Sequence, residues 1–573
     1  EENIFSSEAE LYHQTELFGK LTKIKISPLN INDVSKKELE IFPWLSEKDI
    51  KNILAYLRTN SIKKISDLEK AGINKITISE IEPYFQVKRV LNPTFSNSIR
   101  AEYQQAKADL PSTVKYLQKT IINYSNFNFG FISQKDEGER NPFDFYSYYA
   151  EYCQQNKHFI LGKYRVFLGQ GILFAPKLGI SKSAAATYGA FKQSDTIRPY
   201  TSSYEIWELQ GVAFDYKFSN LKLTAFGSHN SLSANISDNK ITSFNQSGNH
   251  LDPNKKDNVI ETILGSALSY NYKNIKLGIY AIKQKFDLEI DGKNNNYLAI
   301  GTDFNIFTND YPLFGEIAYA DKKVAMILGN KWGDNQIRQL LVFRYYQKDF
   351  PTWHGKPFSA QSSFDNERGI YYGITYIARS NLRFNIYFDV WQHPETRFWE
   401  KMPTSCNEQL FQLEYKHQYN SFRLRIQNRN KEKYITVVES KIRDVTRTVY
   451  RFDWSNDQSS FSLKHRLEYT YEYIVNEKIF EKGYLVFSQL SYKSSIFQLI
   501  FRIAAYNTDV LIYMYENNVD GIMQNRIFSG DGFYAFGLTK IKLNSKVELQ
   551  AKISNILSES DNLKLYLQLI THF

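Results

Sequence analysis

Alternation of apolar and polar side chains runs through most of this chain and constrains its fold more than any other feature. From about Asn97 onward apolar residues recur at every second position, as they do between Leu382 and Val390. Successive side chains of a β-strand point to opposite faces, so each such segment has one apolar face and one polar face. The final segment, Leu563 to Phe573, obeys the same rule and ends on an aromatic residue. The pattern predicts a mainly β protein.

The number and length of these segments favour a large antiparallel transmembrane β-barrel over a soluble sandwich. A barrel with its apolar face in lipid and its polar face toward the lumen produces this alternation, whereas strands this long and numerous are unusual in soluble sheets. Short connections, such as 218–220 and 380–381, alternate with longer ones at 171–202, 232–258, 350–366, 394–407 and 508–525. We expect about 24 strands, with a range of about 22–26, because both chain ends should lie on one side of the membrane.

Composition agrees with a membrane barrel. Aromatic residues make up 16% of the chain, with 41 Tyr and 41 Phe, which suits aromatic girdles at two membrane interfaces. The chain has no apolar run of about 18 residues, so we expect no transmembrane helix. It begins at Glu1 rather than Met, and we therefore expect that a signal peptide has been removed.

Residues 1–93 have a different, helical periodicity, and we expect two domains, 1–93 and 94–573. Asn32 or Asp33 can cap a first helix, Ser46 a second and Ser66 the start of a second unit. Apolar residues at helical spacing predict the core of this N-terminal module: Leu39, Phe42, Leu45, Ile50, Ile53, Leu54 and Leu57.

Two short helix–turn–helix units in tandem resemble the helix-hairpin-helix module of DNA-repair and competence proteins. The two turns are Pro43-Trp44-Leu45-Ser46 and Gly72-Ile73-Asn74. In that family a Gly-hydrophobic-Gly turn approaches a DNA phosphate, and here Trp44, Ser46 and Asn74 stand where glycines are expected. The module is also uncharged overall, with 14 basic and 14 acidic residues, whereas DNA binding rests on a basic surface. The turns are candidates for protein docking, with DNA binding as the alternative.

The segment 161–205 joins two strands and is unusually long and rich in Gly, Ala and Ser. With the helical module, its motifs GKYRVFLGQG, GISKS and IRPYTSSYE resemble a family of large Bacteroidetes outer-membrane β-barrel proteins that contain a helix-hairpin-helix domain. The resemblance implies a bacterial outer-membrane location with the helical module in the periplasm. The segment could form a plug or constriction in the lumen, or an ordinary surface loop. The residues singled out in it are Gly169, Gly171, Lys182, Arg198 and Tyr200.

The terminal Phe573 resembles the recognition signal of outer-membrane barrels, which implies the barrel-assembly machinery as a partner. The formal net charge of +10 belongs to residues 94–573, because the module is balanced. A basic lumen would favour anionic solutes or a polyanion. Alternatively, the cations pair with Glu414, Glu468 and Glu548 in a closed lumen. The predicted lumen-facing cations are Arg383, Arg423, Arg425, Lys464, Arg466, Lys546 and Lys552.

No catalytic or metal-binding motif is present. The chain lacks GxSxG, P-loop and GxGxxG sequences, and its two cysteines and nine histidines have no ligand spacing. We expect no enzymatic activity, no cofactor and no metal. The expected function is an outer-membrane conduit or receptor, embedded in lipid, whose helical module docks a periplasmic or outer-membrane protein. The alternatives are a DNA-uptake protein that binds nucleic acid and a plugged structural barrel.

Overall fold

The computed structural model describes residues 21–573, with gaps at 22–23, 25–27, 35, 43–44, 61, 63, 88–92, 106–112, 140, 142, 155, 176–181, 193–195, 205–207, 246–247, 249–251, 309–310, 335, 352, 362, 398–401, 437–439, 476–478 and 558–561. Within these described residues, no helix has the length and apolar character needed to cross a membrane.

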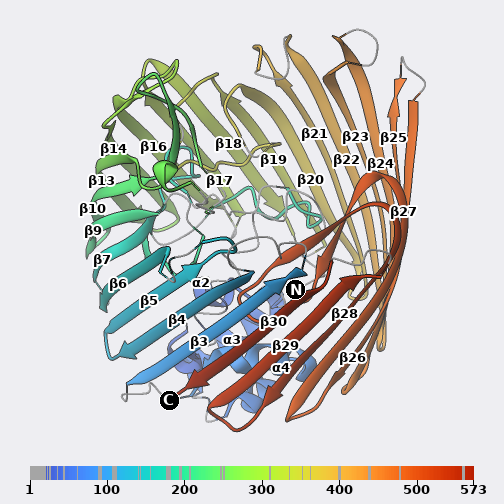
Figure 1. Cartoon of the computed structure of the whole chain (residues 1–573). Helices are drawn as coiled ribbons and strands as arrows, with labels where there is room; N and C mark the ends of the chain where they lie inside the picture. Colours follow the sequence, from blue (N-terminus) through green and yellow to red (C-terminus); the bar gives the residue numbers. More distant parts are fainter. Residues whose placement is uncertain are drawn as a thin grey trace.

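A closed antiparallel β-barrel dominates the structure (Figure 1). Among the described residues, 24 strands form the ring. An additional short strand, β8 (Ile197–Pro199), pairs with the last residues of β7, Tyr164 to Val166. The predicted fold class and strand number are confirmed. The strands of the ring are β3 (Thr94–Gln104), β4 (Val114–Tyr124), β5 (Phe127–Lys135), β6 (Phe145–Gln154), β7 (Lys157–Val166), β9 (Leu209–Phe218), β10 (Leu221–Leu232), β13 (Val259–Tyr272), β14 (Ile275–Phe286), β16 (Asn296–Thr308), β17 (Tyr311–Ala320), β18 (Lys323–Gly333), β19 (Ile337–Tyr346), β20 (Glu367–Arg379), β21 (Leu382–His393), β22 (Thr404–His417), β23 (Asn420–Thr436), β24 (Ser440–Asp457), β25 (Phe461–Ile474), β26 (Ile479–Lys493), β27 (Phe497–Glu516), β28 (Gln524–Lys542), β29 (Val547–Ile556) and β30 (Lys564–His572).

The two ends of the chain of strands close the ring. β30 pairs with β3 from Ser96↔His572 to Gln104↔Lys564. Beyond the last strand pair, Phe95 and Phe573 exchange two backbone hydrogen bonds of 2.8 Å, and their rings lie 6.2 Å apart. The seam therefore ends on the C-terminal residue.

The alternation in the sequence separates an apolar outer face from a polar inner face. On β30, Leu565 and Leu567 are 39% and 54% exposed, whereas Tyr566 and Gln568 between and beside them are buried. On β21, the buried Asp389 lies between the exposed Phe388 and Val390. The outer residues would contact lipid, since in a membrane barrel the apolar side chains face outward.

The barrel wall is uneven in height. β27 has 20 residues and β28 has 19, whereas β5 has 9 and β6 and β7 have 10 each. Figure 1 shows the short strands β5, β6 and β7 at the left-hand side and the tall β27 at the right-hand side. Two-residue turns such as 219–220 and 380–381 gather at one end with the C-terminus, and the long connections gather at the other end, as the sequence predicts.

A small sheet and a helical module complete the fold. A three-stranded sheet lies at the long-loop end and consists of β11 (Ala234–Ser237), β12 (Lys240–Phe244) and β15 (Glu289–Ile290). A short 3-10 helix, η6 (Pro253–Lys255), follows β12 in the chain. The helical module contains β1 (Leu29–Asn30), η2 (Ile31–Asp33), α2 (Lys36–Leu39), α3 (Glu47–Thr59), η3 (Ile65–Ala71), α4 (Lys75–Ile81), η4 (Glu82–Tyr84) and β2 (Phe85–Gln86), and β1 pairs with β2 in parallel.

The module has its own apolar core, in which Leu39, Phe42, Leu45, Ile50 and Ile53 are buried and the predicted core residues Leu54 and Leu57 are partly buried. The predicted cap at Ser46 is confirmed, because its side chain and that of Asp49 form a capping box at α3. The predicted cap at Ser66 is wrong. Ser66 lies inside η3, which begins after Lys64, whose backbone N–H donates to Asp67 Oδ2 at 3.0 Å.

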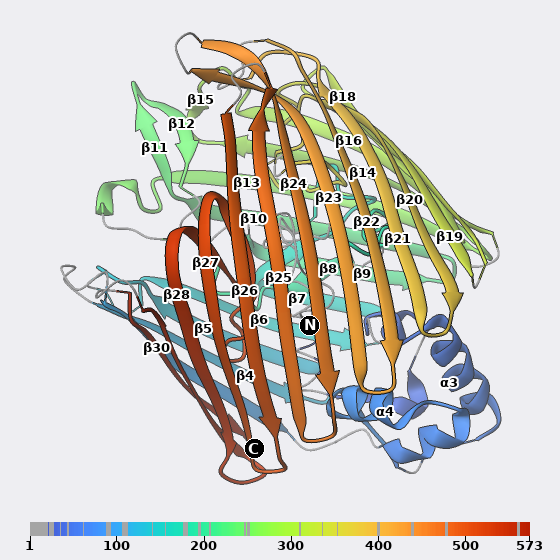
Figure 2. The same ribbon diagram turned by 90° about the vertical axis from the view of Figure 1, so that its right-hand side faces the viewer.

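The module lies at the short-turn end of the barrel (Figure 2). The carboxyl group of Glu80 on α4 is within electrostatic range of Lys416, Asp457 and Lys493. These three residues lie at the ends of β22, β24 and β26, respectively. The module and the C-terminus therefore share one end of the molecule.

We predict that deleting Phe573 weakens the seam. The deletion removes both hydrogen bonds to Phe95, which are worth about 0.5–1.5 kcal/mol each, together with the ring contact. The heat-induced shift of the folded band on a gel should move to lower temperature. Phe461→Ala, which truncates an aromatic side chain that is 52% exposed on the outer face away from the seam, should leave that temperature almost unchanged. An equal effect of both changes would contradict the prediction.

Candidate functional site

The connection between β7 and β9, residues 167–208, folds into the barrel, and we call it the inner loop. Figure 1 shows its described part in teal inside the ring of strands. It contacts the inward side chains of distant strands: Gln170 Nε2 donates to Asn305 on β16 at 3.0 Å, and Ala186 accepts from the Tyr371 hydroxyl on β20 at 2.6 Å. The inner loop therefore crosses the lumen and reaches other parts of its wall.

Glycines allow the close approach at the start of the inner loop. Gly169 has φ +53°, and a Cβ there would lie 2.8 Å from the carboxyl carbon of Glu316 on β17. That carboxylate accepts the backbone N–H groups of Gln170 at 2.5 Å and of Ile172 at 3.2 Å, and the Tyr280 hydroxyl also donates to it. Without a side chain at Gly169, the backbone can wrap around one buried carboxylate.

A second inward segment, the connection 347–366 between β19 and β20, packs against the inner loop. Gly171 O accepts from Lys356 N at 2.8 Å, and Ala175 N donates to His354 O at 2.9 Å. The two segments bring Ile172, Phe174, Phe350 and Phe358, among other buried residues, into one apolar cluster. Burial lowers the pKa of Lys356 to about 8, and the Glu367 carboxylate opposes that shift.

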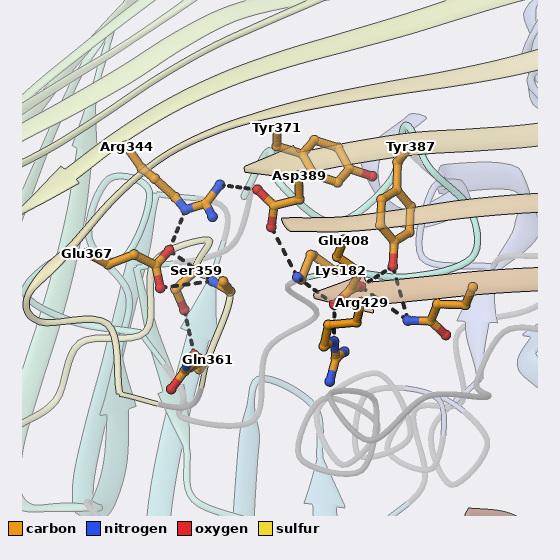
Figure 3. A network of polar contacts seen from close by, with 12 residues as sticks. Lys182, Arg344, Ser359, Gln361, Glu367, Tyr371, Tyr387, Asp389, Glu408 and Arg429 are labelled. Atoms are coloured by element: carbon orange, nitrogen blue, oxygen red, sulfur yellow. Dashed lines mark hydrogen bonds and ion pairs between the residues drawn. The ribbon is translucent and has the colours of Figure 1, made fainter. Parts of the chain in front are cut away.

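Farther along, the inner loop is anchored by a buried network of ion pairs (Figure 3). Lys182 Nζ lies 3.0 Å from Asp389 Oδ2 on β21 and 3.2 Å from Glu408 Oε2 on β22. It also lies 4.5 Å from the centre of the Trp391 ring. A lysine ammonium that is 3% exposed needs such partners, because a buried charge is strongly destabilising unless it is paired.

The network extends to both sides of Lys182. Arg344 on β19 pairs with Glu367 and, at 2.8 Å, with Asp389, while Arg429 on β23 and the Tyr387 hydroxyl donate to Glu408. Glu367 also accepts the backbone N–H of Ala360 at 3.0 Å, so it binds the second inward segment. Three cations face three carboxylates, and the network is therefore balanced in charge.

A third inward segment, residues 509–528 at the tip of the β27–β28 hairpin, covers another part of the wall. Asp520 N donates to Gln550 Oε1 at 2.7 Å and Asp520 O accepts from Gln568 at 2.9 Å. Glu516 pairs with Lys552 and accepts from the Tyr534 hydroxyl. This tip and the inner loop line different parts of the lumen.

The residues predicted for the inner loop are spread along it. Gly171 has φ +91°, and a Cβ there would lie 2.7 Å from Ala175 Cβ. The guanidinium of Arg198 on β8 lies 4.9 Å from the centre of the Phe167 ring. The guanidinium of Arg165 lies 4.4 Å from the centre of the ring of Tyr200, which is buried. Of the predicted set, Lys182 alone belongs to the ion-pair network among the described contacts.

The predicted lumen cations occupy different environments. Arg423 is buried 3.8 Å from Glu414 and 3.8 Å from Asp453, Arg466 is buried 2.6 Å from Asp453, and Arg425 donates to Gln412 at 2.8 Å. Lys552 is buried beside Glu516, and Lys464 is partly buried. Arg383 is exposed at the start of β21, as the second residue of that strand.

Lys546 departs from the predicted lumen position. It is exposed in the β28–β29 turn, with Nζ 5.3 Å from the centre of the Phe573 ring. If the alternation of β29 extended to Lys546, its side chain would face the lumen. The strand begins only at Val547, however, and side chains alternate between two faces only within a strand. The predicted partners Glu468 and Glu548 bind Arg451 at 2.7 Å and Gln550 at 2.6 Å.

The predicted docking hairpins are only partly described. Pro43 and Trp44 lie outside the described residues, and Leu45 is buried in the module core. In the second turn Gly72 has φ +81°, its N–H donates to Glu69 O at 2.9 Å, and Ile73 N–H donates to Leu68 O at 3.2 Å. These two N–H groups close the helix end, as in a C-terminal cap. They already have acceptors in the chain.

The remaining chemistry of the described residues is sparse. They contain no cluster of three or more His, Cys, Asp or Glu that could hold a metal ion. Cys153 is exposed and Cys406 is buried, and neither forms a disulfide. Sequence reasoning did not single out Arg344, Asp389 or Glu408, because alternation marks every inward polar residue alike and does not say which of them meet.

A closed ring of strands with an apolar outer face and a packed polar interior defines an integral outer-membrane β-barrel protein. No family model and no curated protein matches the sequence. The resemblance to the Bacteroidetes helix-hairpin-helix family therefore stays a prediction.

Similar solved structures include outer-membrane receptors and transporters. The siderophore receptor PirA from Pseudomonas aeruginosa matches with TM-score 0.45 and 5% identity over 85% of this chain and 82% of that one. The FrpB iron transporter from Neisseria meningitidis matches with TM-score 0.40 and 8% identity over 84% and 82%. The copper transporter OprC matches with TM-score 0.41 and 8% identity over 84% and 81%. Likeness at this level carries no argument about what this chain binds.

We predict that Gly171→Ala loosens the inner loop. The left-handed backbone strains an alanine by about 1–3 kcal/mol, and its Cβ would also collide with Ala175. Trypsin should then cut within residues 167–208 of the folded protein, where the parent chain resists. Gly292→Ala is the matched control, because Gly292 also has positive φ (+67°) but no atom within 4 Å of the added Cβ. It should leave the inner loop resistant.

We also predict that Lys182→Met destabilises the anchor of the inner loop. Removing one partner of a buried ion pair costs up to about 3–5 kcal/mol, and Arg344 and Arg429 compensate the two carboxylates only in part. Lys240→Met is the control, since the Lys240–Glu289 pair is half exposed or more on both sides and contributes about 1 kcal/mol or less. Thermal unfolding and trypsin sensitivity of the inner loop should both change in the first variant and not in the second.

Proposed function

We propose that this protein is a non-enzymatic outer-membrane receptor or gated conduit whose lumen is closed by the inner loop until a ligand or partner releases it. In the same proposal, the helical module, residues 1–93, lies in the periplasm and docks a protein partner. The barrel, residues 94–573, supplies the membrane passage.

The observation that carries this proposal is the Lys182 network. Barrels of about 16–18 strands already enclose an aqueous channel, and wider ones hold a plugged lumen, so a ring of 24 strands needs filling to be closed. The inner loop fills part of it through polar contacts of Lys182, Ala186 and Thr187 to the wall. Such contacts lose little free energy when water replaces them, which suits a segment that moves.

The periplasmic placement of the module rests on the asymmetry of the connections. In outer-membrane barrels the short turns face the periplasm and the longer loops face outward. The module lies at the short-turn end. Its balanced charge and the closed helix end at Gly72 favour a protein partner over DNA.

Planar-bilayer conductance tests the gate. Replacing residues 170–192 with a short Gly–Ser linker removes the Lys182 anchor and the contacts to Glu316. We expect the parent barrel to be nearly silent and the linker variant to show a steady conductance. The control variant replaces residues 237–240, at the β11–β12 turn, with a Gly–Ser linker. This segment lies at the long-loop end outside the ring, so the control barrel should stay silent.

A folded linker variant that shows no conductance would contradict the proposal of a gated conduit. It would favour the alternative, a plugged structural barrel. Folding is checked independently by the heat-induced shift of the folded band. For the docking role, proteins that co-purify in mild detergent with the full chain should be lost from a variant that lacks residues 1–87. Retention of the same proteins would contradict docking by the module.

A further inference from the structure

The barrel wall opens between β6 and β7 at the long-loop end. β6 pairs with β7 only over Tyr149–Gln154, and its preceding residues, Phe145 to Tyr148, pair with β5 alone among the ring strands. β7 turns away at Gly162, which has φ +104° and where a Cβ would lie 2.3 Å from Tyr148 O. From Tyr164 to Val166, the edge of β7 that faced β6 before Gly162 pairs with β8 instead.

A cavity of about 150 Å³ occupies this opening. Its walls come from the start of β6, from β7, β9 and β10, from Glu208 at the end of the inner loop, and from the connection that follows β12. The polar side chains that line it include Asp144, Lys163, Glu208, Gln210, Asn230 and Lys256. Phe145 and Phe244 add apolar surface. The cavity is separate from the Lys182 network and from the inner loop's described contacts with the opposite wall.

Two carboxylates in the cavity are only half satisfied. Lys163 Nζ lies 2.9 Å from Glu208 Oε1, and Lys256 Nζ lies 2.6 Å from Asp144 Oδ1. The second oxygen of each carboxylate, Glu208 Oε2 and Asp144 Oδ2, is buried and accepts no hydrogen bond. Buried polar atoms nearly always have a hydrogen-bond partner, and an acceptor left without one is destabilising. Both residues line the cavity, and a donor that reached these oxygens from the cavity would satisfy them.

The charges around these acceptors restrict what can donate to them. Lys163 and Lys256 pair with these two carboxylates and would repel a metal ion or an ammonium group that approached the unpaired oxygens. A third carboxylate of the lining, Asp257, is exposed. An anion would face the unpaired carboxylate oxygens. A neutral molecule with several hydroxyl groups donates to such oxygens without bringing a charge, and its carbon-bound hydrogens can pack on phenyl rings. Asn230 and Gln210 lie in the same wall as further polar groups.

We propose that this cavity is a binding site for a neutral sugar, with Glu208 Oε2 and Asp144 Oδ2 as acceptors of its hydroxyl groups. The sugar can belong to a free saccharide or to the headgroup of a glycolipid. The second source fits the surroundings, because Tyr146 and Tyr148 stand beside the opening on the outer face, 53% and 44% exposed, with ring centres 6.3 Å apart. Exposed aromatic pairs of this kind occupy the membrane interface of barrels.

Calorimetric titration of the full chain in a detergent without a sugar headgroup tests the site. The probes are glucose, galactose and N-acetylglucosamine as free sugars, and octyl glucoside below its critical micelle concentration as a glycolipid analogue. We expect saturable binding of at least one probe. Glu208→Gln and Asp144→Asn should each weaken it by about tenfold or more, because each variant loses a hydrogen bond to a charged acceptor.

Asp136→Asn is the matched control. Asp136 is a buried carboxylate at the same end of the barrel that pairs with Lys115 outside the cavity. It should leave binding unchanged. Binding of octyl glucoside alone identifies a glycolipid as the source, and binding of a free sugar identifies a saccharide. No saturable binding of any probe, or binding that survives both cavity substitutions in folded protein, would overturn the proposal.

Discussion

The backbone hydrogen bonds of the strands are the constraint on which the rest of this structure depends. A strand whose outer face lies in lipid finds no water for its N–H and C=O groups, so every strand needs a neighbour on both sides. A sheet can meet that demand only by closing on itself, and here the closure is made by β3 and β30, with Phe95 and Phe573 at its end. The even strand number and the shared end of the module and the C-terminus follow from this closure.

Closing so many strands creates a second demand, because the interior must be filled or left to water. The inner loop, the second inward segment and the β27–β28 tip fill part of it, and the buried groups around Lys182 are matched in charge. Lys182 illustrates the balance: it is held between Asp389 and Glu408, which are themselves paired with Arg344 and Arg429. Buried ion pairs contribute little net stability but fix geometry when every member is satisfied. They hold the inner loop in one place.

Prediction from the sequence succeeded where a property repeats locally. The exposed Phe388 and Val390 on either side of the buried Asp389 follow directly from alternation, and so do the outward Leu565 and Leu567. Ser46 was predictable as a cap because a capping box spans only four residues. Lys546 and Ser66 were misplaced because a boundary, where strand or helix geometry ends, has a weaker local signal than the element itself.

Sequence alone determined that this chain forms a large barrel with an apolar outside, a polar inside and a separate helical module, since side-chain alternation and helical spacing are properties of neighbouring residues. Only the tertiary structure decided which inward groups meet. Lys182 and Glu408 are 226 residues apart, and Glu316 receives backbone N–H groups from a segment 146 and 144 residues away. Those meetings depend on the path of a loop across a closed ring, and on the split of β7 from β6 at Gly162, neither of which has a periodic signature.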